Sequence, residues 1–424
     1  MATPPVTADA VLEPLTMGAV LRIAPMRRLW YAQIVSTFGD FLALFAVIGF
    51  LTFRLQATPQ QVTGLQIAYL LPIAVLGVLA GVFVDRWPLK PTLIASDLIR
   101  ACLCLLLLVS TRIVHFYAAL ATISVVSSFF TPAQSVAIRS AVPRHGLRSA
   151  NALMQQVMFI MRIVGPGIAG VLVLTFGARS CYIVDAASFV GSACLIASVA
   201  LTRITAPAHP NSAMQEEITG LARLWSDMKQ GIGFIFHHAA LLFVILALAS
   251  GMFVIGCFGP LIAVYVRDTL HASTPTFDAA SAMIGFGILI GMNALNAFAK
   301  KVRHATLVYS GLSGIALGLL VLTLAPFIWT TLLANLSIGV AVSAIILPSQ
   351  TMIQQETPPA LMGRVGSTVM SLVFSAQIGG LVLSGLLADR IGVRHVFAVC
   401  ACLLALLIFI GRVWMEPKEG TAVD

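Results

Sequence analysis

The sequence predicts an all-α membrane protein whose twelve transmembrane helices form two six-helix bundles. Of its 424 residues, 59% are hydrophobic and only 10% are charged, whereas soluble domains carry about 25% charged residues. Its apolar runs are close to the roughly 20 residues that cross a bilayer as a helix. The second half of the chain also repeats features of the first half in the same order.

The apolar runs define the expected helices and parts of the chain. We expect transmembrane helices over residues 29–53, 62–84, 92–111, 116–138, 150–174, 180–202, 240–265, 278–299, 305–324, 327–349, 365–387 and 393–414. The expected parts are a cytoplasmic N-terminal tail (1–28), the N-terminal bundle (29–202), a cytoplasmic linker with an amphipathic helix (203–239), the C-terminal bundle (240–414) and a cytoplasmic tail (415–424). Residues 1–20 lack an apolar core behind a basic start, so we expect disorder and no cleavable signal peptide.

Basic residues fall mainly on one side of the predicted helices. With the N-terminus inside, seventeen Lys and Arg residues lie in cytoplasmic segments and six lie in the opposite ones. Cytoplasmic loops carry such an excess, so we expect both termini in the cytoplasm. The net charge of +9 then reflects orientation, and no nucleic-acid partner is expected.

Short motifs recur in the two halves. Residues 132–134 (Pro-Ala-Gln) correspond to 348–350 (Pro-Ser-Gln), and residues 177–179 (Gly-Ala-Arg) correspond to 392–394 (Gly-Val-Arg). This parallel repeat predicts that six helices are followed by six of the same arrangement.

The connection at residues 81–91 joins two predicted helices tightly and carries Gly81, Asp85, Arg86 and Lys90. A generic positive-inside hairpin would explain the basic residues alone. The spacing Gly-x-x-x-Asp-Arg-x-x-x-Lys, however, resembles the signature loop of the major facilitator superfamily. The resemblance implies a conformational switch loop, in which the Asp85 carboxylate caps the N-terminus of the eleventh helix.

Further motifs resemble one branch of that family, which holds enterobactin-exporter-like and macrolide-efflux-like members. They lie at residues 131–134, 142–144, 150–153 and 162–170, and residues 38–40 (Phe-Gly-Asp) are also similar in lysophospholipid transporter relatives. The resemblance implies a secondary active transporter of the cell inner membrane, a monomer in the lipid bilayer, with its small-molecule site between the bundles.

Three charged residues lie deep inside predicted helices, where charge is costly and usually functional. By helical rise, Asp40 lies about 15–17 Å and Arg162 about 18 Å from the inner ends of their helices, while Asp185 lies about 8–9 Å from an outer end. We expect Asp40, Arg162 and Asp185 to meet near the midplane. There they could carry protons, or they could form a static ion pair that fixes the bundle.

Asp97 and Arg100 are three residues apart near the start of the third helix, so they share a helix face. We expect them to brace the switch loop rather than to touch substrate.

Gly165, Pro166 and Gly170 in the fifth helix resemble the antiporter motif, although Ala169 stands where a glycine is usual. Proline permits a bend and small residues permit close helix contact, so a pivot is expected. The alternative is that these residues have no special role, since Gly and Pro are simply frequent in membrane helices.

The family architecture implies polar cavity residues on several helices. The candidates are Gln33, Gln155, Asn293, Asn335 and Gln377. A cavity with few charges and with flexible Met and Phe side chains suits an amphipathic substrate. Each candidate taken singly could instead serve packing.

Signatures of enzymes and metal sites are missing from the sequence. It has no Gly-x-x-x-x-Gly-Lys-Ser/Thr loop, no His-Glu-x-x-His and no paired CxxC. We therefore expect no enzyme activity, no cofactor and no metal. A proton-coupled exporter (antiporter) of drugs or siderophores is the first hypothesis. A lysophospholipid transporter or flippase and proton-coupled uptake of a small solute remain alternatives, and a membrane sensor or enzyme lacks the domain it would need.

Overall fold

The computed structural model describes residues 15–84, 87–200, 233–236, 238–298, 302–358 and 361–415. The first half contains α1 (Met17–Arg22), α2 (Ala24–Gly49), the π-helix η1 (Phe50–Arg54), α3 (Pro59–Val84), α4 (Leu89–Leu107), α5 (Ile113–Ala141), the 3-10 turn η2 (Arg144–Gly146), α6 (Leu147–Phe176) and α7 (Ala178–Ala197). The second half contains α9 (Ala239–Asp268), α10 (Thr274–Phe298), α11 (His304–Leu324), α12 (Ile328–Glu356), α13 (Met362–Ile391), α14 (Val393–Ile410) and the π-helix η3 (Gly411–Met415).

Each of the twelve predicted spans overlaps one long helix, with bounds that differ by a few residues, and the described ranges contain no strand. Within those ranges, nine helices are long and apolar enough to cross a membrane. The all-α fold is therefore confirmed. The predicted linker helix lies largely within residues 201–232, outside the described residues.

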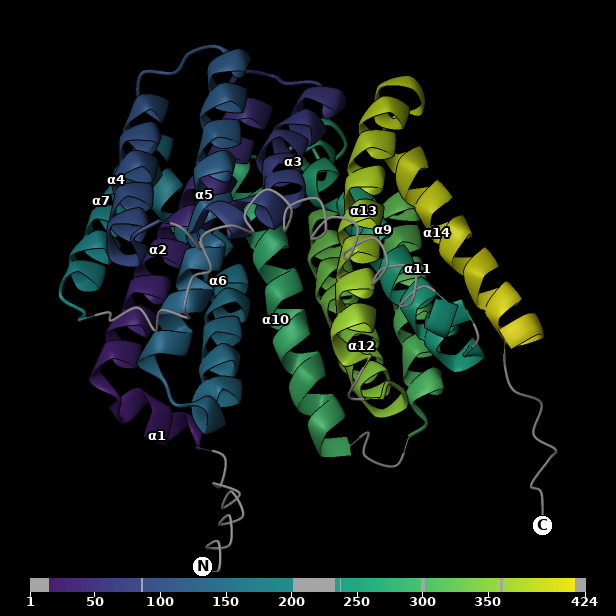
Figure 1. Ribbon diagram of the computed structural model, residues 1–424. Coiled ribbons are helices and arrows are strands. Elements are labelled where there is room, and N and C mark those ends of the chain that lie inside the picture. Colours follow the sequence, from purple (N-terminus) through teal and green to yellow (C-terminus); the bar gives the residue numbers. More distant parts are fainter. Residues whose placement is uncertain are drawn as a thin grey trace, which may run out of the picture.

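The helices pack as two bundles (Figure 1). In the first, α2 packs on α7 and α6, while α5 packs on α3 and α4. In the second, α12 packs on α10 and α11, and α9 packs on α13. Two helix pairs, α6 with α10 and α3 with α13, make most of the contact between the bundles.

The internal repeat appears in the backbone as well as in the sequence. Gly177, between α6 and α7, has a φ of 80°, and Gly392, between α13 and α14, has a φ of 81°. Only glycine adopts this region at little cost. Pro132 and Pro348 also both lie inside their helices, α5 and α12. The same turn chemistry thus folds both halves.

At one end of the molecule the two bundles are in close contact, and we call this the closed end. Arg267 of α9 donates hydrogen bonds of 2.8 Å to the carbonyl oxygens of Thr52 and Ala57. Phe277 of α10 packs on Phe45 and Phe53, with ring centroids 5.9 and 6.4 Å apart. A side chain at position 385 of α13 would collide with α3.

At the other end, which carries α1, the bundles separate. In Figure 1 the lower parts of α6 and α10 diverge. Near the start of α13, a Cβ atom added to Gly366 would meet no described heavy atom within 4 Å. The contacts named above between the bundles therefore lie at the closed end, and we call the opposite end the α1 end.

Residues 15–20, which we expected to be disordered, are ordered, whereas residues 1–14 lie outside the described residues. The Leu15 amide donates to the His145 carbonyl at 3.2 Å, and the Ser149 hydroxyl donates to the Leu15 carbonyl at 2.6 Å. Thr16 caps α1 by accepting from the Ala19 amide, and Val20 is fully buried. Composition missed this helix because contacts with the start of α6 stabilise it.

The interface between α10 and α12 should tolerate no side chain at Gly339. A Cβ atom there would lie 2.9 Å from the Gly287 Cα and 2.9 Å from the Ile284 carbonyl carbon. Overpacking costs about 1–3 kcal/mol, so Gly339→Ala should lower the melting temperature of the purified protein. The matched control is Gly259→Ala in α9, which should not lower it, because no heavy atom of the described residues lies within 4 Å of a Cβ atom added there. Equal melting temperatures for the two variants would contradict the contact.

Candidate functional site: a charge cluster in the N-terminal bundle

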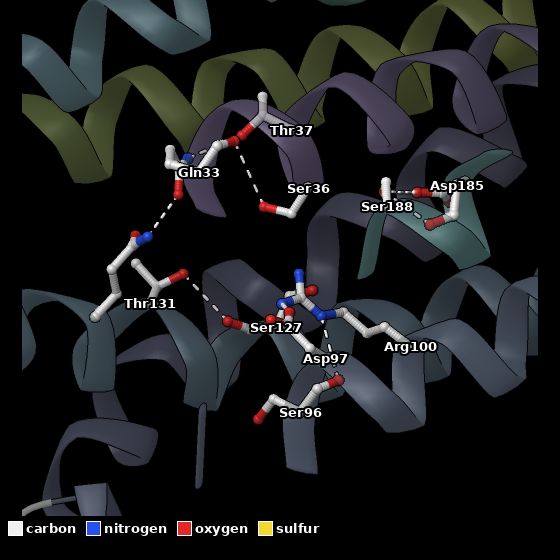
Figure 2. A network of polar contacts seen from close by, with 11 residues as sticks. Gln33, Ser36, Thr37, Ser96, Asp97, Arg100, Ser127, Thr131, Asp185 and Ser188 are labelled. Atoms are coloured by element: carbon white, nitrogen blue, oxygen red, sulfur yellow. Dashed lines mark hydrogen bonds and ion pairs between the residues drawn. The ribbon is translucent and has the colours of Figure 1, made fainter. Parts of the chain in front are cut away.

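An ion pair lies buried at the centre of the N-terminal bundle. Arg100 and Asp97, one turn apart on α4, form a direct salt bridge, with side chains 4% and 0% exposed. The Arg100 Nε donates a weaker hydrogen bond to the Ser96 carbonyl at 3.4 Å (Figure 2). The spacing of three residues places both charges on one helix face, as the sequence predicted.

Two aromatic rings enclose the Arg100 guanidinium. Its carbon lies 4.3 Å from the ring centroid of Phe130 on α5 and 4.4 Å from that of Phe189 on α7. A desolvated cation over a ring gains about 2 kcal/mol. The two rings therefore help to offset the cost of burying this charge away from water.

Asp185 of α7 lies in the same interior and is 2% exposed. The Cys104 thiol of α4 donates to its Oδ2 at 2.9 Å, and the Ser188 hydroxyl lies 3.4 Å from its Oδ1. Across from it is Gly39 of α2, where an added Cβ would lie 2.9 Å from the Asp185 Cα. The missing side chain of Gly39 thus admits the α7 backbone and the Asp185 carboxyl.

Asp40 follows on the next position of α2 and is only half-buried. It lies close enough to Arg100, Asp97 and Asp185 for their charges to act on it. Asp40, Asp97, Arg100 and Asp185 therefore form one charge cluster, drawn from α2, α4 and α7. The phenol of Tyr69 on α3 lies within electrostatic range of Asp40, Arg100 and Asp185.

The cluster agrees only partly with the sequence prediction. Asp40 and Asp185 do lie together, but the side chain of Arg162 is outside the described residues. The described cation beside Asp40 is Arg100, which we had assigned with Asp97 to a brace near the switch loop. Both side chains start about 12–17 Å into α4, and they point into the bundle, where they pack on α5 and α7.

A second polar network lies nearer the α1 end (Figure 2). The Gln33 amide of α2 donates to Thr37 at 2.9 Å and lies 4.0 Å from the Met158 sulfur of α6. The Gln134 amide of α5 donates to the Gln33 Oε1 at 2.5 Å. Gln33 thus links three helices and is itself partly exposed.

The other predicted cavity residues have different environments. Gln155 on α6 and Asn293 on α10 are exposed, and Gln377 on α13 is half-buried. Asn335 on α12 is fully buried, and neither of its amide atoms has a partner in the described part of the chain. Asn335 is therefore enclosed in the packed C-terminal bundle and does not line an open cavity in this conformation.

The glycine and proline group of α6 contacts both bundles. A Cβ atom on Gly165 would lie 2.6 Å from the Phe41 Cβ of α2, and one on Gly170 would lie 2.7 Å from the Asp278 Cβ of α10. Pro166 is buried inside the helix between them. The group thus provides close helix contacts, while its role as a pivot stays a prediction.

The predicted switch loop is described only in part. Gly81 lies in the last turn of α3 and Lys90 in the first turn of α4, near the α1 end. Asp85 and Arg86 lie outside the described residues. Beside the loop, the ring of Trp87 stacks on Phe129 of α5 with centroids 5.4 Å apart.

Asp278 is a buried carboxylate that the sequence analysis did not select. It lies four residues inside α10 and is 3% exposed. The sequence places Asp278 at the first position of the predicted transmembrane span 278–299, where an acidic residue is not unusual. The signal that could have found it is the polar start of α10, where Ser273, Thr274 and Thr276 precede it and Thr274, four residues earlier, shares its helix face. Elsewhere in the described chain, no three His, Cys, Asp or Glu residues gather as metal ligands.

The ion pair allows a test of charge burial. Arg100→Met should lower stability by about 3–5 kcal/mol, because it leaves Asp97 buried without its partner. Adding Asp97→Asn should recover part of the loss. Thermal unfolding of the purified variants measures both, with Arg112→Met, at an exposed arginine, as the control. A single variant as stable as the wild type would show that the pair is not needed.

Comparison with known proteins agrees with this architecture. The sequence pattern of the Major Facilitator Superfamily matches residues 29–380. The MFS-type transporter YfiS of Bacillus subtilis is 26% identical over 399 residues, which cover 92% of each chain. Macrolide efflux protein A of Streptococcus pyogenes is 26% identical over 394 residues, which cover 89% of this chain and 92% of that protein.

The fold is shared with solved transporters. The crystal structure of a POT family transporter in complex with 5-aminolevulinic acid has a TM-score of 0.70 at 10% identity, and the match covers 92% of this chain and 96% of that one. The family match extends over both bundles, and its members are transporters rather than enzymes. This multi-pass membrane transporter therefore belongs to the Major Facilitator Superfamily.

Proposed function

We propose that the protein is a proton-coupled exporter, an antiporter of amphipathic small molecules such as drugs or siderophores, working by alternating access. The observation that carries the proposal is Asp40, a partly exposed carboxylate in the middle of a transmembrane helix, beside the buried Arg100 and Asp185. Intramembrane acids of this kind mark proton pathways in transporters. The similarity to macrolide efflux protein A supports export.

The charge cluster suggests how a proton would be handled. A carboxylate next to a guanidinium favours release of its proton, and one that faces another carboxylate favours retention. Asp40 has both kinds of neighbour, so a small movement of α2 against α4 or α7 would change its protonation. Proton and substrate would then alternate at one site as the bundles rock.

The proposed orientation places the α1 end in the cytoplasm and the closed end outside. The excess of basic residues near the α1 end supports it, by the positive-inside rule. Both termini would then be cytoplasmic, and the protein would be a monomer in the cell inner membrane. The conformation described above would be open to the cytoplasm, from which an exporter takes its substrate.

An amphipathic substrate fits the side chains near the opening. Met158 on α6 is 43% exposed, and Gln33 supplies a polar group beside it. Flexible Met and Phe side chains adapt to several ligand shapes. A lysophospholipid or a small solute taken up with protons are the competing substrates, and the transport test below includes them.

Asp40→Asn should abolish gradient-driven transport while sparing substrate binding, because the amide keeps the shape of the carboxyl but cannot carry a proton. Asp40→Glu should retain part of the activity. Efflux from proteoliposomes with an imposed proton gradient measures this, over a panel of macrolides, dyes, siderophores and lysophospholipids. Asp389→Asn, at an exposed aspartate near the end of α13, is the control.

Two outcomes would overturn the proposal. Full gradient-driven transport by Asp40→Asn would exclude this carboxyl as the carrier. Transport that persists in a protonophore without a sodium gradient would exclude ion coupling. Movement of lysophospholipids alone would instead identify the lipid-transporter alternative.

The switch loop provides a separate test. A carboxylate at a helix N-terminus gains up to about 2 kcal/mol, so Asp85 would stabilise the state that is closed at the α1 end. Asp85→Asn should slow transport at normal expression. It should also reduce cysteine crosslinking between the C-terminal end of α3 and the N-terminal end of α13, at the α1 end. Wild-type turnover with unchanged crosslinking would contradict the role.

A further inference from the structure

Asp278 is a second buried acid, at the contact between the two bundles. It projects from α10 against α6 at the closed end, and 3% of it is exposed. A Cβ atom added to Gly170 of α6 would lie 2.7 Å from its Cβ, 3.2 Å from its Cγ and 3.1 Å from its Oδ2. Within the described chain, Oδ2 has no hydrogen-bond partner. One oxygen of this carboxyl is therefore buried without a partner at the contact between the bundles.

The groups around Asp278 do not neutralise it. The titratable and charged residues of the elements around it are Arg148 and Arg162 on α6, Arg179, Cys181, Tyr182, Asp185 and Cys194 on α7, Arg27, Arg28, Tyr31, Asp40 and Arg54 on α2 and η1, Cys257, Tyr265, Arg267 and Asp268 on α9, and Glu356 on α12. Of these, the Cys181 thiol lies close enough to interact electrostatically with Asp278. Burial disfavours the ionised form of the Asp278 carboxyl, and no cation among the described groups stabilises that form. Arg267 is held by Asp268 and by the carbonyls of Thr52 and Ala57.

A cavity large enough to hold water begins about one helical turn from the contact between Gly170 and Asp278. A cavity of about 730 Å³ opens at the closed end, lined by Val173 of α6, Thr274 of α10 and the exposed Arg54 and Arg179. Val173 follows Gly170 by three residues, and Thr274 precedes Asp278 by four. When α6 and α10 separate at this end, the Asp278 carboxyl would therefore meet the water of this cavity.

We propose that Asp278 is a proton-binding site of the gate at the closed end. Its carboxyl is neutral while it is packed against Gly170, because an ionised carboxylate without a partner is strongly disfavoured in an apolar contact. It ionises when the bundles part and water reaches it. Binding a proton at Asp278 thus favours closure at this end, and losing the proton favours opening.

This site is distinct from the charge cluster, which contains its own cation and lies within one bundle. The inference rests on the alternating access of the family and does not need proton-coupled transport. A carrier at Asp40 and a gate at Asp278 can each fail alone. A conformational measurement without substrate or gradient therefore tests the gate separately.

The sign of the pH effect follows from the burial. The closed population should be fully present at low pH and should fall as pH rises. If one proton is involved, the ratio of closed to open molecules changes by at most about tenfold per pH unit. Replacing the carboxyl with an uncharged group should remove this dependence.

Spin labels across the closed end can report the two populations. We would attach them to Gln60→Cys on α3 and Ser273→Cys before α10, both exposed positions, after replacing the exposed Cys102, Cys194 and Cys402. Pulsed-EPR distances in lipid nanodiscs, measured over a pH series, should show a short-distance population that declines with rising pH. Asp278→Asn, or Asp278→Ser if the first variant folds poorly, should keep that population at every pH. Asp389→Asn should respond as the wild type does.

Three results would overturn the proposal. The wild-type distances could be independent of pH, or Asp278→Asn could retain the full response. The response could also vanish in Asp40→Asn and persist in Asp278→Asn, which would assign it to the charge cluster. Gly170→Ala should reduce the short-distance population at every pH, and an unchanged population would show that this contact is not part of the gate.

Discussion

The burial of Arg100 is the constraint on which the centre of the N-terminal bundle depends. A guanidinium in a bilayer needs a counter-charge, and Asp97 supplies it from the same helix. The rings of Phe130 and Phe189 then close around it from α5 and α7. Because three helices must converge on one cation, their rotations are fixed together. The positions of Asp40 and Asp185 follow from this arrangement.

Close backbone approach is the second constraint, and it connects the cluster to the contact between bundles. Gly39 lets α2 meet α7 at Asp185, and Gly170 lets α6 meet α10 at Asp278. Lipid offers no hydrophobic drive for helix association, so such small residues decide where helices touch. Cys181 of α7 lies near enough to sense both Asp185 and Asp278.

The two bundles share a topology but not a polar interior. The turns at Gly177 and Gly392 and the prolines of α5 and α12 repeat. The ion pair and its aromatic enclosure belong to the first half, whereas Asp278 of the second half stands against the first at the interface. The internal repeat thus extends to the turns and prolines of the scaffold, whereas the described buried charges differ between the halves.

The sequence by itself determined the all-α fold, the approximate position and order of the long helices and the repeat of the halves. It could do so because a chain in lipid must satisfy its backbone hydrogen bonds within each helix, which makes span length a local property. It also identified Asp40, Asp97, Arg100 and Asp185 as costly charges. Only the tertiary structure decided three features of the interior. Among the described residues, Arg100 is the cation close to Asp40, Asn335 is enclosed, and the Asp278 Oδ2 is buried without a partner. Those outcomes depend on how each helix is rotated and crossed against its neighbours, and packing between residues distant in the chain sets that geometry.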